Sequence, residues 1–223
     1  MNQTYQQSEK LASLFNYPNE SFVQSVNAVQ TYLNENYPEA AEELARFTSF
    51  VSAPSTTFAQ LEELYARTFE VQAITTLDIG YVLFGDDYKR GALLVNLNRE
   101  HREAGVDCGN ELADHLPNVL RLLARMSDAE LREELVQKIV APALRKIISE
   151  FDPEKMRQKN AIYQKHHKTL IERSARHGTI YQYPLTALYR VLEADFDLKE
   201  FGSLPVPGAE FLKSIGSEMS IES

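Results

Sequence analysis

The sequence contains little cysteine, glycine and proline, and each shortage argues against a class of protein. Among its 223 residues there is one cysteine, Cys108, so no disulfide can form within the chain and a reducing compartment is expected. Glycine and proline number nine each. This is low for an all-β protein, which must turn roughly every ten residues. The composition therefore favours helices.

Long apolar runs are also missing. No window approaches the roughly 18 consecutive apolar residues that a membrane-spanning helix requires. The N-terminal stretch MNQTYQQSEKLASLF has no basic region followed by a long apolar segment, so no secretory signal is indicated. The net charge of −9 disfavours a nucleic-acid partner and favours a basic one. These features predict a soluble, cytoplasmic protein without a membrane span.

What the sequence does contain is apolar residues at helical spacing along most of its length. The segments that carry this pattern are 20–36, 38–51, 57–70, 85–105, 111–126, 127–151, 153–177 and 184–196. We therefore predict a single all-α domain of roughly eight to ten helices over residues 1–200. Residues 201–223, rich in Gly, Pro and Ser, are predicted to form a flexible C-terminal tail.

Several residues predict where helices begin, bend and end. Thr57 is expected to cap one helix, and Ser127 with Glu130 matches a capping box for another. Gly105 is expected to end a helix, and Pro142 should kink one because it lacks a backbone donor. The β-branched segment 71–84 suits a strand, but its neighbours are strongly helical, so we interpret it as a short, mostly helical element.

Three ionisable side chains, Glu111, Asp114 and His115, precede Pro117 and a run of leucines. On a continuous helix, Glu111 and His115 would share a face, with Asp114 close by. The pattern also suits a helix start, in which Asp114 is the cap and Pro117 occupies the first turn, where no backbone donor is needed. We favour this second interpretation, with the acid exposed and able to bind a partner.

A metal site is the alternative interpretation of the same cluster. His101 and Cys108, upstream, could add ligands to it. However, an HExxH motif is absent, and one cysteine with scattered histidines has no recognisable ligand spacing. The sequence therefore does not predict a metal or another cofactor.

Catalytic motifs are equally scarce. The segment FGDDYKRG contains two glycines but no Gly-Lys-Ser/Thr, so it is not a phosphate-binding loop. We interpret it as a tight turn with Gly85 at positive φ and Asp86 or Asp87 as a helix cap. The basic stretch 166–168 is expected to be a solvated face. With no nucleophile elbow and no recognisable carboxylate pair, the residues do not indicate an enzyme.

Aromatic residues are spread over two adjoining segments. They are Tyr65, Phe69, Tyr81, Phe84 and Tyr88. We expect most of them in the core, whereas a few exposed tyrosines beside acidic residues would form a peptide-binding groove.

Three segments, LEELYARTFE (61–70), YVLFGDDYKRGALLVNL (81–97) and REAGVDCGNELADHLPNVLRLL (102–123), carry a resemblance. They are similar to the nitrate reductase delta-subunit (NarJ-like) family, within the TorD- and DmsD-like assembly chaperones of molybdenum enzymes. GDDYKRG and the acid–histidine–leucine–proline combination are the most specific parts. Many relatives have proline where this chain has Ala113.

The resemblance implies an all-helical chaperone that is not an enzyme. Such chaperones bind the N-terminal leader of the apo catalytic subunit of a molybdopterin oxidoreductase of the nitrate/DMSO reductase family. They keep that subunit competent for insertion of the molybdenum cofactor, and they delay membrane attachment or export until insertion is complete. The resemblance therefore implies one partner, the apo catalytic subunit with its leader peptide.

The resemblance also implies which residues bind the peptide. Asp114 and His115 match the family's acid–histidine motif, and the other candidates lie beside it or on the family's aromatic and glycine positions, except Phe84, which we add as part of an apolar wall. The full set is Asp114, His115, Glu111, Pro117, Tyr65, Phe69, Phe84, Gly85 and Tyr88.

Within this set we expect the acids and the aromatics to play different parts. Asp114, together with Glu111, is expected to accept hydrogen bonds from the leader, and His115 to orient the Asp114 carboxylate. Tyr65, Phe69, Phe84 and Tyr88 are expected to form an apolar wall.

Two other functions remain open at this point. A metal-dependent hydrolase could use His and Asp on facing helices of such a fold. A structural subunit that stays in a helical complex is the second possibility.

Overall fold

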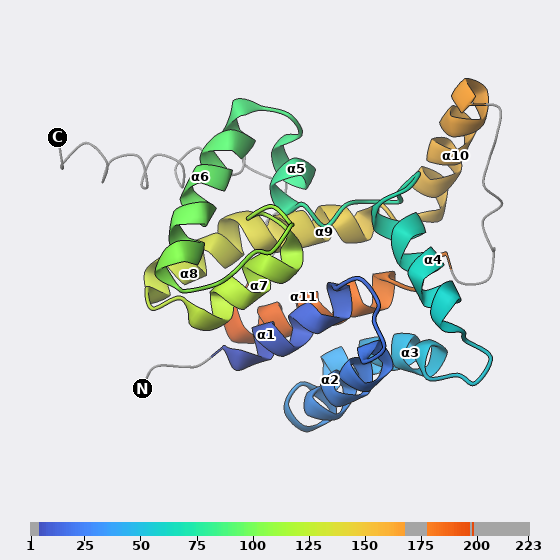
Figure 1. Cartoon of the computed structure of the whole chain (residues 1–223), viewed down its shortest axis with the longest axis horizontal. Helices are drawn as coiled ribbons and strands as arrows, with labels where there is room; N and C mark the ends of the chain where they lie inside the picture. Colours follow the sequence, from blue (N-terminus) through green and yellow to red (C-terminus); the bar gives the residue numbers. More distant parts are fainter. Residues whose placement is uncertain (1–4, 168–177, 197, 199–223) are drawn as a thin grey trace. The chain divides into compact units, whose positions relative to one another are not determined.

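The computed structural model describes residues 5–167, 178–196 and 198, and these residues are predominantly helical (Figure 1). No strand occurs among them; the only β-type pairing that they contain is a single bridge between Asp78 and His115. The predicted all-helical fold is therefore confirmed. The predicted tail at 201–223 and part of the basic stretch 166–168 lie outside the described residues.

The helices follow one another along the described part of the chain. In order they are α1 (Gln6–Ala12), the 3-10 helix η1 (Ser13–Phe15), α2 (Phe22–Asn36), α3 (Pro38–Val51), α4 (Phe58–Phe69), α5 (Ile79–Phe84), α6 (Tyr88–Glu103), α7 (Leu116–Arg125), α8 (Ala129–Leu135), the π-helical segment η2 (Val136–Val140), α9 (Ala141–Ser149), α10 (Pro153–His167) and α11 (Gln182–Phe196).

The chain divides into two compact units that interleave along the sequence. Unit 1 comprises Met1–Asn16, Leu77–Leu144 and Val191–Ser223, and unit 2 comprises Tyr17–Thr76 and Arg145–Arg190. Two of the boundaries fall inside α9 and α11, so no separate linker marks them. This is why the sequence contains no linker-like segment at these two boundaries.

Unit 2 is built around an aromatic cluster. Tyr181 is almost fully buried, with its ring centroid 4.9 Å from that of Phe69 and 5.1 Å from that of Phe47. Tyr65 packs edge-on against Phe69 at 5.2 Å. Burial raises the pKa of Tyr181 far above its usual value. Such aromatic pairs add directional contacts to the burial of apolar area, so these side chains belong to the core of unit 2.

Unit 1 is organised around α7, which is buried on most of its surface. Leu116, Val119 and Leu123 have no solvent exposure. Helix α1 packs directly against α7, and Arg125 of α7 pairs with Glu9 of α1 at 2.8 Å. The start of this buried helix fixes the position of Asp114 and His115, which directly precede it.

The predicted helix ends are mostly confirmed. Thr57 caps α4 in a capping box with Gln60, and Gly105, at φ +63°, follows the end of α6. The cap of α8 is Asp128 and not Ser127, because the helix begins one residue later than predicted. The Asp128 carboxylate accepts a hydrogen bond from the amide of Leu131 at 3.0 Å.

Pro142 distorts its helix as predicted, but the distortion is a π-helical turn before the proline and not a simple kink. The π-helical segment η2 immediately precedes Ala141 and Pro142. Because the proline cannot donate to the carbonyl of Lys138 and its ring would crowd that oxygen, a wider turn relieves the conflict. The backbone is locally expanded at the site of the expected kink.

The segment 71–84 is only half helical, so this prediction is partly wrong. Ile79–Phe84 forms α5, whereas the residues before it make turns and the bridge to His115. The amide of Leu116 donates to the carbonyl of Leu77 at 2.9 Å. A backbone partner distant in sequence therefore overrides the local helical tendency.

The position of the α8 cap can be tested with neighbouring substitutions. Asp128→Ala is expected to lower the free energy of unfolding by about 1 kcal/mol, because the Leu131 amide loses its acceptor. Ser127→Ala should change it by less than about 0.5 kcal/mol. Urea unfolding of both variants measures the difference, and a larger loss for Ser127→Ala contradicts the assigned cap.

Candidate functional site

The acid–histidine motif lies where two segments of unit 1 are joined through their backbones by the bridge between Asp78 and His115. The amide of Ile79 donates to the carbonyl of Asp114 at 3.0 Å, which places the start of α5 beside the start of α7. Helix α7 begins at Leu116, with His115 as its N-cap residue and no side-chain cap. The favoured prediction, that Asp114 caps this helix, is therefore wrong, and the alternative of a helix that continues through 111–115 is wrong as well.

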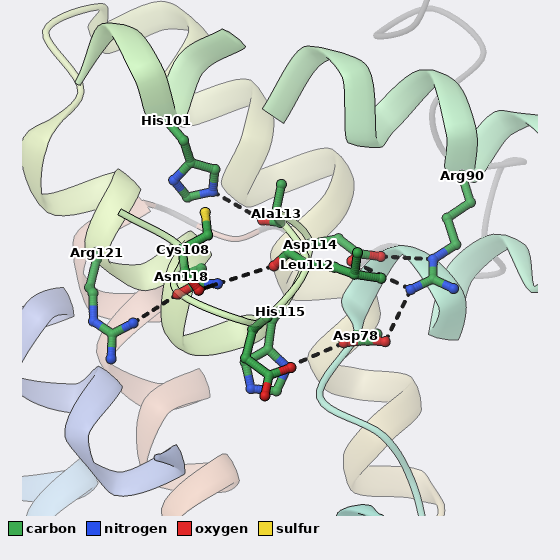
Figure 2. A network of polar contacts seen from close by, with 11 residues as sticks. Asp78, Arg90, His101, Cys108, Leu112, Ala113, Asp114, His115, Asn118 and Arg121 are labelled. Carbon is green, nitrogen blue, oxygen red and sulfur yellow. Dashed lines mark hydrogen bonds and ion pairs between the residues drawn. The ribbon is translucent and has the colours of Figure 1, made fainter. Parts of the chain in front are cut away.

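The carboxylate of Asp114 is fully buried and is bound by Arg90 of α6. Arg90 Nε donates to Asp114 Oδ2 at 2.9 Å, and Arg90 Nη2 lies 3.4 Å from Oδ1 (Figure 2). The exposed fraction of the Asp114 side chain is 0%, so the expected exposed acid is not found here. A buried carboxylate requires a paired cation and hydrogen bonds, and Arg90 supplies both.

Arg90 also binds a second carboxylate, that of Asp78. Its Nη2 donates to Asp78 Oδ2 at 3.0 Å. Asp78 Oδ1 lies 3.2 Å from His115 Nδ1, so this histidine contacts Asp78 and not Asp114 as expected. We call Asp78, Arg90, Asp114 and His115 the Arg90 cluster.

The cluster contains one partly exposed acid and adjoins a second. The side chain of Asp78 is 27% exposed, and that of Glu111, whose Oε2 lies 3.9 Å from His115 Nδ1, is 62% exposed. The hydrogen bond with His115 lowers the pKa of Asp78; burial opposes this shift, and the nearby charges of His115 and Arg90 strengthen it. Asp78 is therefore ionised at neutral pH, and its carboxylate is partly exposed.

Gly80 allows α5 to approach the buried carboxylate closely. A Cβ atom at this position would lie 2.6 Å from Asp114 Oδ2 and 3.1 Å from Leu93 Cδ2. No side chain fits there without displacement of the ion pair. Sequence reasoning missed Asp78, Gly80 and Arg90, although Arg90 lies within the GDDYKRG segment.

A second set of buried polar groups fixes the loop before α7. His101 Nε2 lies 3.0 Å from the carbonyl oxygen of Ala113, and Asn118 Nδ2 donates to the carbonyls of Cys108 and Leu112 at 3.2 and 3.1 Å (Figure 2). Arg121 in turn donates to Asn118 Oδ1 at 2.8 Å. These contacts hold the backbone that carries Asp114 and His115.

His101 and Cys108 therefore sit beside the cluster without forming a metal centre. In the part of the chain that the structure describes, no three His, Cys, Asp or Glu side chains are grouped to hold a metal ion. Burial lowers the pKa of His101, and because its Nε2 faces a carbonyl oxygen, that nitrogen carries the proton. The histidine acts as a neutral hydrogen-bond donor.

The remaining candidates divide between the surface of unit 1 and the core of unit 2. Tyr88 is largely exposed, Phe84 is half-buried, and Gly85 has the predicted positive φ of +62°. Pro117 is buried in the first turn of α7. Tyr65 and Phe69 are buried in the aromatic cluster of unit 2, as the expectation of core aromatics allowed.

Two further apolar side chains near the cluster are exposed and lie outside the predicted set of site residues, although Tyr81 was one of the aromatic residues considered. Tyr81 is exposed on α5, with the Arg90 guanidinium carbon 5.2 Å from its ring centroid, and Leu112 is exposed in the loop that carries Glu111. This surface can accept hydrogen bonds at Asp78 and Glu111 and can cover apolar groups nearby.

Comparison with known proteins adds no assignment, because no protein-family model and no curated protein matches the chain. Within the described residues, no helix is both long enough and apolar enough to cross a membrane.

Removal of the Arg90 charge tests the electrostatic role of the cluster. Arg90→Met is expected to lower the free energy of unfolding by about 3–5 kcal/mol, because it leaves the buried Asp114 carboxylate without its cation. Adding Asp114→Asn should recover part of this loss, since the amide carries no charge. Urea denaturation gives the values, and a loss below about 1 kcal/mol for Arg90→Met would contradict the assigned role.

The lowered pKa of His101 predicts that the free energy of unfolding depends on pH. Its pKa in the folded protein lies below its value in the unfolded chain, about 6.5, so the unfolded state binds the proton more strongly. The stabilisation by neutral His101 is therefore fully present above the pKa of the unfolded state. It is lost as the pH falls from that pKa through the lower pKa of the folded state.

The matched variant for this prediction is His101→Gln, which keeps a donor for the Ala113 carbonyl and does not titrate. Its free energy of unfolding should fall less than that of the wild type as the pH is lowered from about 7 to about 5. Equal slopes in thermal or urea unfolding would show that His101 does not contribute.

Proposed function

We propose that this protein is a system-specific chaperone for the apo catalytic subunit of a molybdopterin oxidoreductase of the nitrate/DMSO reductase family. In this role it binds the subunit's N-terminal leader and supports insertion of the molybdenum cofactor before membrane attachment or export. The observation that supports the proposal is the Arg90 cluster. Two segments that resemble the NarJ-like family, 81–97 and 102–123, meet there through Arg90 and Asp114.

The chemistry of a leader suits the surface beside this cluster. The resemblance to the NarJ-like family implies a leader that carries arginine followed by an apolar stretch. Asp78 and Glu111 provide accessible carboxylates, and Tyr81, Tyr88 and Leu112 provide exposed apolar area in the same unit. The net charge of −9 accelerates the encounter with a cationic segment, and apolar burial then holds it.

The structure changes the roles expected within the site. Because Asp114 is buried, it acts as a positioning residue: with Arg90 it fixes Asp78, which takes the partner-facing role together with Glu111. His115 orients Asp78. Tyr65 and Phe69 contribute to the core of unit 2 and are not assigned to the peptide surface.

This function requires binding and release but no chemical conversion. A dissociation constant near 1 μM, about −8 kcal/mol, allows the client to leave once it has matured. The alternative of a metal-dependent hydrolase has no supporting observation, since the described residues do not group potential ligands.

Purification of the protein from its native host tests the proposal directly. We expect an immature molybdenum-enzyme subunit to co-purify, identified by mass spectrometry, and we expect the protein to be absent from the mature, active enzyme. Recovery of no such polypeptide, or turnover of a small substrate by the purified protein alone, would contradict the proposed function.

The residue roles can be tested with a synthetic peptide that carries two arginines followed by an apolar stretch. Asp78→Asn with Glu111→Gln should weaken its binding in titration calorimetry by at least about tenfold, a loss of about 1.4 kcal/mol, because both accessible acceptors lose their charge. Circular dichroism should show unchanged helix content.

The matched control is Glu42→Gln on α3, which removes one exposed negative charge in unit 2. It should leave peptide affinity almost unchanged. If Glu42→Gln weakens binding as much as the double variant does, general charge and not the site determines affinity.

A further inference from the structure

The partly exposed carboxylate of Asp78 already holds a guanidinium that belongs to the fold. Arg90 Nη2 donates to Asp78 Oδ2 at 3.0 Å, and His115 Nδ1 lies 3.2 Å from Asp78 Oδ1 (Figure 2). A carboxylate binds an arginine most strongly when both of its oxygens accept from the same guanidinium. An arginine from a partner that binds Asp78 in this way therefore competes with Arg90 for Oδ2.

The ring of Tyr81 is shared in the same manner. Arg90 Cζ lies 5.2 Å from the ring centroid, and the Tyr81 side chain is still exposed. The face of an aromatic ring attracts a guanidinium. A carboxylate beside such a ring is thus a suitable place for an arginine, and Arg90 occupies this place from within the fold.

Arg90 can release Asp78 without losing its own counter-charge. Its Nε donates to Asp114 Oδ2 at 2.9 Å, and the Asp114 side chain is fully buried, whereas that of Asp78 is partly exposed. A buried ion pair is screened by water much less than a pair at the surface. The contact between Arg90 and Asp114 is therefore the stronger one, and the contact between Arg90 and Asp78 is the one that can be exchanged.

We propose that Arg90 is an internal competitor that limits how tightly this site binds an arginine of a partner. When the partner binds, its guanidinium takes the Asp78 carboxylate beside Tyr81, and Arg90 keeps only its contact with Asp114. The contact that positions Asp78 in the free protein thereby lowers the affinity for the partner. This inference rests on the proposed function, and it describes how the client is kept releasable.

A charge-neutral double variant, Arg90→Met together with Asp114→Asn, tests the competition. It removes one positive and one negative charge, so the net charge of −9 is kept and no unpaired carboxylate is left buried. In titration calorimetry it should bind the peptide with two arginines and an apolar stretch about threefold more tightly than the wild type, because Asp78 no longer shares Oδ2. Equal or weaker binding would show that Arg90 only positions Asp78, and would overturn the proposal.

The matched control removes a neighbouring ion pair from the same helix. Arg99 Nη2 lies 3.1 Å from Glu100 Oε1, and Arg99→Met together with Glu100→Gln makes the same change of charge on α6. This variant should bind the peptide as the wild type does. If it gains as much affinity as the first double variant, the effect belongs to the charges of α6 in general and the proposal is wrong.

A second peptide shows whether the competition takes place at the guanidinium. Citrulline keeps the shape of arginine but carries no charge, so a peptide with citrulline at both arginine positions should bind the wild type and the Arg90→Met, Asp114→Asn variant equally. A gain of the same size with this peptide contradicts the proposal. Failure of both proteins to bind the arginine peptide contradicts the proposed function as well, whereas binding without a gain contradicts this inference alone.

Arg90→Lys tests the same point in a protein that keeps a cation for the buried Asp114 carboxylate. A single ammonium group does not reproduce the planar fork with which Arg90 reaches two carboxylates. This variant should therefore also bind the arginine peptide more tightly than the wild type, with circular dichroism confirming its helix content. Binding no tighter than that of the wild type would overturn the proposal even if the double variant did not fold.

Discussion

The guanidinium of Arg90 compensates the fully buried carboxylate of Asp114, and the start of α7 depends on this ion pair. Arg90 lies on α6, Asp114 precedes α7, and Gly80 lets α5 pack against the same carboxylate. Because an isolated buried charge is strongly unfavourable, these three segments are stable together and not separately. The pair thereby fixes the accessible acids beside it.

The fold was largely predictable because its local signals are strong. Thr57, Gly105 and Pro142 act within one or two helix turns, so the sequence around each contains the reason for its role. The segment before α5 was misjudged because the backbone partners of Leu77 and Ile79 lie more than thirty residues away in the sequence. Helix α1, which packs on α7, was not predicted at all.

The site was predictable as a motif but not as a geometry. The acid–histidine pair drew attention to Asp114, yet its burial follows from Arg90 and from Gly80, whose proximity no spacing rule reveals. Asp78 was missed for the same reason: an aspartate in a β-branched segment looks like an ordinary loop residue. A charged side chain 24 positions away decides which acid is buried and which can contact a partner.

Hydrogen–deuterium exchange with the arginine-containing apolar peptide tests the central claim most directly. If the peptide binds beside the Arg90 cluster, amides within 78–88 and 111–116 should exchange more slowly when it is present, because binding suppresses local opening. Amides of α2 and α3 in unit 2 should not change. Protection confined to unit 2, or no protection at saturating peptide, would contradict the account.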